Sequence, residues 1–242
     1  MIRFSANLGF LWADLPLPQS IARAAAAGFA AVECHWPYDT PAAATRAALA
    51  AASVPMLSLN TRPGDSFGLA ARTDQDKARA ATREALDYAA ATDTAMVHVM
   101  AGKGGDEAIF REHLRWACDL AAPLGIALLI EPINPFDVPG YHLTHPDQAA
   151  ATIAEVNRPN LGMMLDFYHI GRLGLNPLDT YRQHRTRIGH IQIAAVPDRG
   201  PPDQGTVDYS ALLPQIDWPA PIGAEYRPPG ATEASLDWLK TL

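Results

Sequence analysis

The stretch Ile126-Ala127-Leu128-Leu129-Ile130-Glu131 is a short apolar run that ends in a carboxylate. A run of this kind is typical of a strand buried on both faces, as the strands of parallel sheets are. The arrangement recurs at Leu161-Gly162-Met163-Met164-Leu165-Asp166, after an Ala-rich helical pattern over residues 146–156. A strand, a helix and a second strand in this order form a βαβ unit, so this part of the chain predicts a parallel sheet.

The same alternation extends along the whole chain. Strands are predicted at 3–10, 30–36, 55–60, 96–102, 126–132, 161–167, 187–194 and 221–227. Helices are predicted at 18–27, 41–52, 74–91, 106–124, 146–156, 177–185, 209–216 and 235–242. Such units, repeated about eight times in about 250 residues, predict an α/β protein with a (β/α)8 TIM barrel. We expect one domain over residues 1–242. A doubly wound open sheet is the structural alternative, but the G-x-G-x-x-G fingerprint is missing after the first strand.

Composition and charge argue against several classes of protein. The 242 residues include 19 Lys and Arg against 26 Asp and Glu, and a net charge of −7 does not favour binding to nucleic acid or anionic lipid. There is no long apolar stretch, and the first ten residues lack the pattern of a signal peptide, so we expect neither a membrane span nor a leader. Cys34 and Cys118 do not make a disulfide framework. A cytoplasmic protein is expected.

Polar side chains end the last four predicted strands. Glu131, Asp166 and Glu225 end the fifth, sixth and eighth strands, and Gln192 shares the inward face of the seventh with His190. The carboxyl ends of barrel strands meet at one mouth, where the active sites of this fold lie. Carboxylates that converge there would repel one another unless a cation lies between them, and an all-oxygen set suits Mg²⁺ or Mn²⁺. The alternative is that each acid caps a helix or pairs with an arginine.

Four strings at these strand ends form a recognisable set. They are Glu131-Pro132-Ile133-Asn134 with Asp137-Val138-Pro139-Gly140-Tyr141, Asp166-Phe167-Tyr168-His169, Gly189-His190-Ile191-Gln192-Ile193-Ala194, and Gly223-Ala224-Glu225-Tyr226. Together they resemble the hydroxypyruvate isomerase family of the xylose-isomerase-like TIM barrel superfamily, in the order of that family and over essentially the whole chain.

The resemblance implies a role for each matching residue. Glu131, Asp166, Gln192 and Glu225 would bind a divalent metal, Mg²⁺ or Mn²⁺, and Glu131 and Glu225 would also be the catalytic acid and base. His169 is implied as a substrate contact, and Arg199 looks like the arginine that this family places at the mouth.

The activity implied is the interconversion of hydroxypyruvate and 2-hydroxy-3-oxopropanoate (tartronate semialdehyde) through an enediolate. A metal would stabilise the developing charge, and two carboxylates would transfer the proton. The carboxylate of the substrate needs a cationic partner, for which Arg199 and Lys103 are the candidates on predicted loops of the mouth. His98 and Asn134 complete the predicted substrate-binding residues.

Several positions depart from the family pattern, among them Ala195, Thr206 and Phe67, and Pro135-Phe136 replaces a more polar pair. Ala195 and Thr206 stand where acidic residues are usual, and Phe67 stands where an arginine is common. Two alternatives therefore stay open: an isomerase or epimerase of a longer sugar acid, such as a 2-oxo-tetronate, and a ligand-binding barrel without turnover. An endonuclease of the superfamily would need a His-rich multi-zinc site and a basic groove, which this acidic sequence does not indicate. By analogy with the family, the protein could form a homo-oligomer.

Overall fold

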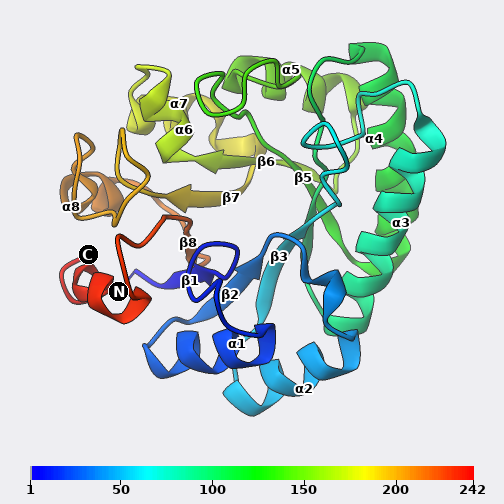
Figure 1. Ribbon diagram of the computed structural model, residues 1–242. Coiled ribbons are helices and arrows are strands. Elements are labelled where there is room, and N and C mark those ends of the chain that lie inside the picture. Colours follow the sequence, from blue (N-terminus) through cyan, green and yellow to red (C-terminus); the bar gives the residue numbers. More distant parts are fainter. Residues whose placement is uncertain (1) are drawn as a thin grey trace.

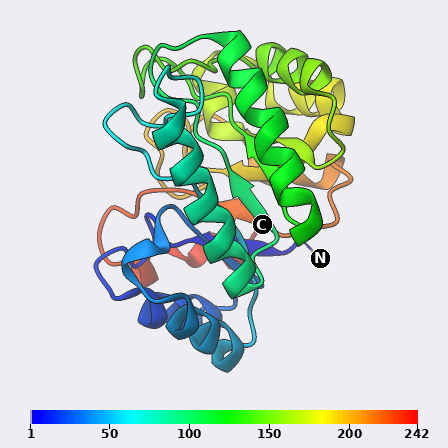
Figure 2. The ribbon, with the colours of Figure 1, turned by 90° about the vertical axis from the view of Figure 1, so that its right-hand side faces the viewer.

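The computed structural model describes residues 2–242, in which parallel strands close into a barrel surrounded by helices (Figures 1 and 2). Within these residues the strands pair in chain order, and β8 returns to β1. The strands are β1 (Phe4–Asn7), β2 (Ala31–Cys34), β3 (Met56–Asn60), β4 (Met96–His98), β5 (Ala127–Ile130), β6 (Leu161–Asp166), β7 (Ile188–Ile193) and β8 (Ile222–Ala224). The predicted TIM barrel is confirmed. Each strand is shorter than predicted, because the residues at its ends already belong to the loops.

Helices connect the strands and cover the outside of the barrel (Figure 1). They are α1 (Leu17–Ala26), α2 (Ala42–Ala52), α3 (Gln75–Thr92), α4 (Glu107–Ala121), α5 (Pro146–Val156), α6 (Phe167–Arg172), α7 (Pro177–His184) and α8 (Tyr209–Leu212). Side chains satisfy the first backbone N–H groups of several: Asp106 accepts hydrogen bonds from Ala108 N and Ile109 N at the start of α4. No helix within residues 2–242 combines the length and apolar character that crossing a membrane requires.

The C-terminal segment differs from its prediction. A helix was expected over residues 235–242, but the structure has two short 3₁₀ turns, Thr232–Ser235 and Asp237–Lys240. The hydroxyl of Ser235 donates to the carbonyl of Thr232 at 2.7 Å, a local bond that competes with a continuous helix. Trp238 then packs beside the barrel, at 4.9 Å from the ring of Phe4 in β1. The local bond of Ser235, together with the packing of Trp238, decides the backbone here over helical periodicity.

The inside of the barrel is polar below its mouth. Glu33 in β2 accepts hydrogen bonds from Ser5 Oγ and from Gln192 Nε2, and His190 Nε2 lies 2.9 Å from Glu33 Oε1. The inward direction predicted for His190 and Gln192 is therefore confirmed. Residues of the opposite strand face, such as Ile191, belong to the apolar core between the strands and the helices.

A buried histidine in the layer of helices around the barrel makes the free energy of unfolding depend on pH. His113 of α4 is fully buried, with Nε2 3.0 Å from Thr82 Oγ1 and Nδ1 3.0 Å from Gln75 Oε1. Burial lowers the pKa of His113 to about 4, and the charge of Arg79 lowers it further. In the unfolded chain its pKa would be about 6.5. The unfolded state therefore takes up a proton at a higher pH than the folded state does.

From this difference we predict that acidification destabilises the fold through His113. The stabilisation is present above the unfolded pKa and is lost as pH falls from about 6.5 towards about 4. At pH 5 the loss is about 2 kcal/mol relative to pH 7. Urea unfolding at the two pH values measures it, and the variant His113→Gln, which keeps polar partners for Thr82 and Gln75, is expected to lose that part of the pH dependence. An unchanged pH dependence in the variant would contradict the prediction.

Candidate active site

A cavity of about 330 Å³ lies at the carboxyl ends of the strands. We call it the mouth cavity. Its ionisable lining residues are His35, His98, Glu131, Asp137, His169, Arg199, Glu225 and Arg227. Predicted site residues from five different parts of the chain therefore meet at one place: His98, Glu131, His169, Arg199 and Glu225. The cavity lies where this fold places its active sites.

Glu131, Asp166 and His169 form a compact group at the barrel mouth, in which Glu131 and His169 line the mouth cavity and the buried Asp166 does not. Glu131 directly follows β5, Asp166 ends β6, and His169 lies in α6. Helix α6, which was not predicted from the sequence, begins because Asp166 Oδ1 accepts the backbone N–H of Tyr168 at 2.9 Å. This helix brings His169 Nε2 to 3.5 Å from Glu131 Oε1 and 3.7 Å from Asp166 Oδ2.

Asn134 holds the ring of His169. Its Oδ1 accepts the backbone N–H groups of Phe136 and Asp137, so its Nδ2 is left to donate to His169 Nδ1 at 2.6 Å. The neutral imidazole must then carry its proton on Nε2, which faces Glu131 and Asp166. Asn134 is fully buried and does not line the cavity. The structure therefore does not support the predicted substrate contact for Asn134 and gives it a positioning role instead.

Glu225 has a partner for each of its carboxylate oxygens. His35 Nε2 lies 2.6 Å from Oε1, and Arg199 Nη2 donates to Oε2 at 2.9 Å. Burial acts to raise the pKa of Glu225, but the charge of Arg199 and the hydrogen bond with His35 outweigh it and lower that pKa to about 2. His35 was not among the predicted site residues. The available signal was its position two residues after the inward-facing Glu33, since alternate strand residues share a face.

Arg199 lies among the carboxylates of the chain itself. Besides its bond to Glu225, its Nη2 lies 3.3 Å from Asp166 Oδ2, and its Nη1 lies 3.8 Å from Asp137 Oδ2. The guanidinium also packs over the ring of Tyr168 at 4.7 Å. Its charge is therefore already balanced by protein groups. The expectation that Arg199 takes the carboxylate of a substrate finds no support in this arrangement.

Glu131 and His98 lack the partners that Glu225 has. Burial raises the pKa of Glu131 well above its usual value, and the nearby charges of Glu225 and Asp166 add to the effect. Burial lowers the pKa of His98 to about 4, so its ring is neutral near pH 7. Among the described residues, Glu131 Oε1 and both ring nitrogens of His98 have no hydrogen-bond partner. Unpartnered buried polar atoms that face a cavity are available to a ligand.

The residues fit a divalent cation in part. Glu131, Asp166 and His169 each offer a ligand atom within 4.8 Å of the others. Glu131 Oε1 and Gln192 Oε1 are buried oxygens without a partner in residues 2–242, as the ligands of an absent ion would be. His169 is the weakest member, because its Nε2 carries the proton when Asn134 donates to Nδ1. Both oxygens of Glu225 already have protein partners, so the fit is best at Glu131 and Asp166.

Two further predicted residues lie outside the cavity lining. Gln192 lies deeper, where its Nε2 donates to Glu33 Oε2 at 2.8 Å. Lys103 is exposed on the loop after β4, and it does not line the mouth cavity. The structure thus gives no support to Lys103 as a substrate contact. Gly104 and Gly105, which both have positive φ angles, turn this loop before α4 begins.

Comparison with known proteins gives consistent matches over nearly the whole chain. The family described as xylose isomerase-like TIM barrel matches residues 21–242. The 2-oxo-tetronate isomerase of Cupriavidus necator is 38% identical to this chain, over 99% of this chain and 98% of that protein. The hydroxypyruvate isomerase of Escherichia coli is 34% identical, with coverage of 99% and 98%. A solved structure from Brucella melitensis, described as an AP endonuclease of family 2, is 35% identical with a TM-score of 0.95, over 99% of this chain and 98% of its own.

Proposed function

The chain belongs to the xylose isomerase-like TIM barrel family, and within it we propose that it is an aldose–ketose isomerase interconverting hydroxypyruvate and 2-hydroxy-3-oxopropanoate. One observation carries this proposal: Glu131 and Glu225, two buried carboxylates that follow β5 and β8, line the same cavity at the barrel mouth. The isomerases of Cupriavidus necator and Escherichia coli, each similar along nearly its full length, support the same class of reaction.

The reaction needs two proton-transfer groups and a site for developing charge. A carboxylate first removes a proton from C3 of hydroxypyruvate, which gives the C2–C3 enediolate. A carboxylic acid then returns a proton to C2. The hydroxyl proton moves from O3 to O2, which leaves the new aldehyde at C3. Glu131 and Glu225 are positioned for these transfers from different walls of the cavity. The Nε2–H of His169 and the guanidinium of Arg199 supply hydrogen-bond donors beside them, where negative charge on oxygen would develop.

We propose that the divalent cation is Mg²⁺ or Mn²⁺. Glu131 and Asp166 would hold it, and Gln192 and Glu225 would complete the set predicted from the sequence. Asp166 and Glu225 would then have to exchange contacts with Arg199 for contacts with the ion, since Arg199 now pairs with both. When bound, the cation would act as a Lewis acid on the enediolate oxygens.

A 2-oxo-tetronate is the second candidate substrate, and a specific observation favours keeping it. Phe67, which replaces an arginine common in the hydroxypyruvate isomerase pattern, lines the mouth cavity. An apolar ring at this position supplies no cationic partner for a carboxylate, so it does not favour the shorter of these two monocarboxylic acids. The relative from Cupriavidus necator that is named for this substrate is 38% identical to this chain.

Nucleic acid is not proposed as a substrate, although one similar solved structure is described as an AP endonuclease. The chain carries a net charge of −7, and of the two arginines that line the mouth cavity within residues 2–242, Arg199 already pairs with carboxylates. A phosphate backbone needs a row of cationic side chains, which this cavity does not supply. We also propose a cytoplasmic location, which agrees with Cys34 and Cys118 both being free thiols. A homo-oligomer stays a prediction by analogy with the family.

The proposal is tested by incubating the protein with hydroxypyruvate in D₂O and following the substrate by proton NMR. Formation of 2-hydroxy-3-oxopropanoate with deuterium at C2 is expected. Parallel samples that are dialysed against EDTA and then supplied with Mg²⁺ or Mn²⁺ test the cation. Turnover of a 2-oxo-tetronate with none of hydroxypyruvate would favour the second candidate. Absence of both turnover and exchange with either acid would leave a binding barrel and overturn the proposal.

Replacing Gly9 with Ala is expected to lower kcat by about 10- to 100-fold, because a small displacement of a catalytic group is enough for such a loss. A Cβ at Gly9 would overlap the ring of His35, which would have to turn away from Glu225. Steady-state kinetics check this, with Gly230→Ala as the matched control, since nothing lies within 4 Å of a Cβ there. Equal kcat values for Gly9→Ala and the control would show that His35 does not position Glu225.

A further inference from the structure

One cationic side chain that lines the mouth cavity, that of Arg227, has no role in the site as described so far. Within the described residues, the Lys and Arg side chains that line this cavity are those of Arg199 and Arg227. The guanidinium of Arg199 pairs with Asp166 and Glu225. The guanidinium of Arg227 takes part in none of the ion pairs or side-chain hydrogen bonds formed by residues 2–242, and Arg227 is exposed.

The backbone directs Arg227 to the cavity. Glu225 and Arg227 are two residues apart on the extended segment after β8, so both line the cavity, while Tyr226 between them is buried on the other side. The backbone N–H of Arg227 donates to the carbonyl of Arg199 at 2.7 Å, which holds the two arginines side by side. The ring of Phe10 lies against both, with its centroid 5.2 Å from the Arg199 guanidinium and 5.4 Å from that of Arg227.

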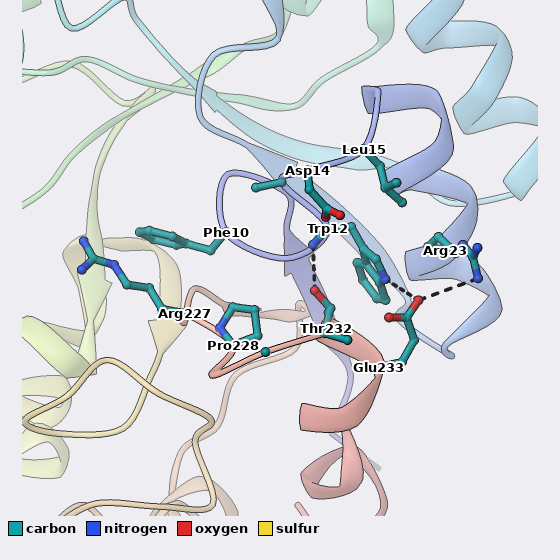
Figure 3. Close-up of a pocket in the computed structure, with 12 residues that line it drawn as sticks. Phe10, Trp12, Asp14, Leu15, Arg23, Arg227, Pro228, Thr232 and Glu233 are labelled. Atoms are coloured by element: carbon teal, nitrogen blue, oxygen red, sulfur yellow. Dashed lines mark hydrogen bonds and ion pairs between the residues drawn. The ribbon is translucent and has the colours of Figure 1, made fainter.

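The carboxylate of Glu233, across a second cavity from Arg227, is engaged elsewhere. A second cavity of about 690 Å³ adjoins the first and shares Phe10 and Arg227 with it. Figure 3 shows Arg227 beside Phe10 on one side of this second cavity and Glu233 on the other, bound to Trp12 and Arg23. Trp12 Nε1 donates to Glu233 Oε1 at 2.8 Å, and Arg23 Nη1 lies 3.8 Å from the same oxygen. Glu233 therefore pairs with these groups and leaves Arg227 to an external anion.

We propose that Arg227 binds the carboxylate of the 2-oxo acid and thereby selects acids over neutral sugars of the same length. This inference rests on the proposed function. A guanidinium matches a carboxylate through two parallel hydrogen bonds. With the carboxylate on Arg227 at the rim, C2 and C3 of the substrate extend inward to Glu131 and Glu225. Arg227 thus takes the role that the sequence analysis gave to Arg199 and Lys103.

The test compares Arg227→Gln and Arg227→Lys with the unaltered protein on two substrates. Hydroxypyruvate carries the carboxylate, and dihydroxyacetone has a hydroxymethyl group in its place. Loss of a charge-assisted hydrogen bond in Arg227→Gln is expected to raise KM for hydroxypyruvate roughly 10- to 100-fold, with little change in kcat. Its kinetics with dihydroxyacetone are expected to stay unchanged, and Arg227→Lys should recover part of the affinity. The matched control is Arg23→Gln, a nearby arginine that does not line the mouth cavity.

Binding of pyruvate, measured by calorimetry, separates failure of this inference from failure of the proposed function. If the unaltered protein binds pyruvate and Arg227→Gln binds it roughly 10- to 100-fold less tightly, Arg227 is the carboxylate site even if hydroxypyruvate is not turned over. If hydroxypyruvate is turned over and its KM is the same in Arg227→Gln and Arg23→Gln, the function stands and the inference is overturned. Equal losses on hydroxypyruvate and dihydroxyacetone would also overturn it.

Discussion

The variant Glu131→Gln is expected to lower kcat for hydroxypyruvate by about 10²- to 10⁴-fold, the usual contribution of a positioned acid or base. Gln has nearly the same shape as Glu but cannot take or give the proton. Glu131 Oε1 has no hydrogen-bond partner in residues 2–242, so the substitution breaks no bond at that atom. The measurement is steady-state kinetics combined with the rate of deuterium incorporation at C2 in D₂O.

The melting temperature of this variant shows whether a loss of activity comes from the missing catalytic group or from a less stable fold. Burial and the charges of Glu225 and Asp166 already disfavour an ionised Glu131, and Gln cannot ionise at all, so the melting temperature is expected to be equal or higher. The matched control is Glu107→Gln, a carboxylate of α4 outside the mouth cavity that pairs with Arg111 and His142. This control is expected to retain full activity. A Glu131→Gln protein with nearly normal kcat would remove Glu131 from the proton transfer.

The variant Trp238→Ala is expected to lower the free energy of unfolding by about 3–5 kcal/mol, the range for truncating a buried aromatic ring. Trp238 is 1% exposed and packs edge-on against Phe4, Phe29 and Tyr226. Its removal leaves a cavity between the C-terminal turns and the β1–β8 seam of the barrel. Urea unfolding monitored by circular dichroism measures the loss.

Two comparisons show whether the effect comes from this packing. Trp238→Phe keeps a ring at the site and is expected to lose less than Trp238→Ala. Leu124→Ala truncates a side chain that is 47% exposed, so a change of about 0.5 kcal/mol or less is expected. If Trp238→Ala cost no more than the Leu124 variant, the C-terminal turns would contribute nothing to closing the barrel.

The barrel could be predicted because its signals are local. Apolar runs such as 126–130 and 161–165 alternate with helical patterns, and nearly every predicted element lies where the structure has one. The C-terminal turns and α6 were the exceptions. In both, local side-chain bonds, from Ser235 to the carbonyl of Thr232 and from the backbone N–H of Tyr168 to Asp166, decide the backbone over a few residues. Such short segments carry too few residues for a periodic pattern to show.

The candidate site was predicted less completely than the fold. Strand ends indicated that Glu131 and Glu225 share the mouth, and both line its cavity. The same reasoning could not show that Arg199 would pair with Asp166 and Glu225, or that Arg227 would be left free. An arginine on a loop can reach several carboxylates, and which one it binds depends on where the loop is held.

By itself, the sequence determined a (β/α)8 barrel whose last four strands bring Glu131, Asp166, Gln192 and Glu225 toward one end. Tertiary structure alone decided how these groups are paired. His35 contacts Glu225 although 190 positions separate them, and Asn134, after β5, sets the tautomer of His169, in α6, across 35 positions. Strand patterns depend on neighbours in the chain, whereas these contacts exist only once the strands that carry them, β5 beside β6 and β8 closed against β1, have assembled and burial has made each unpaired charge costly.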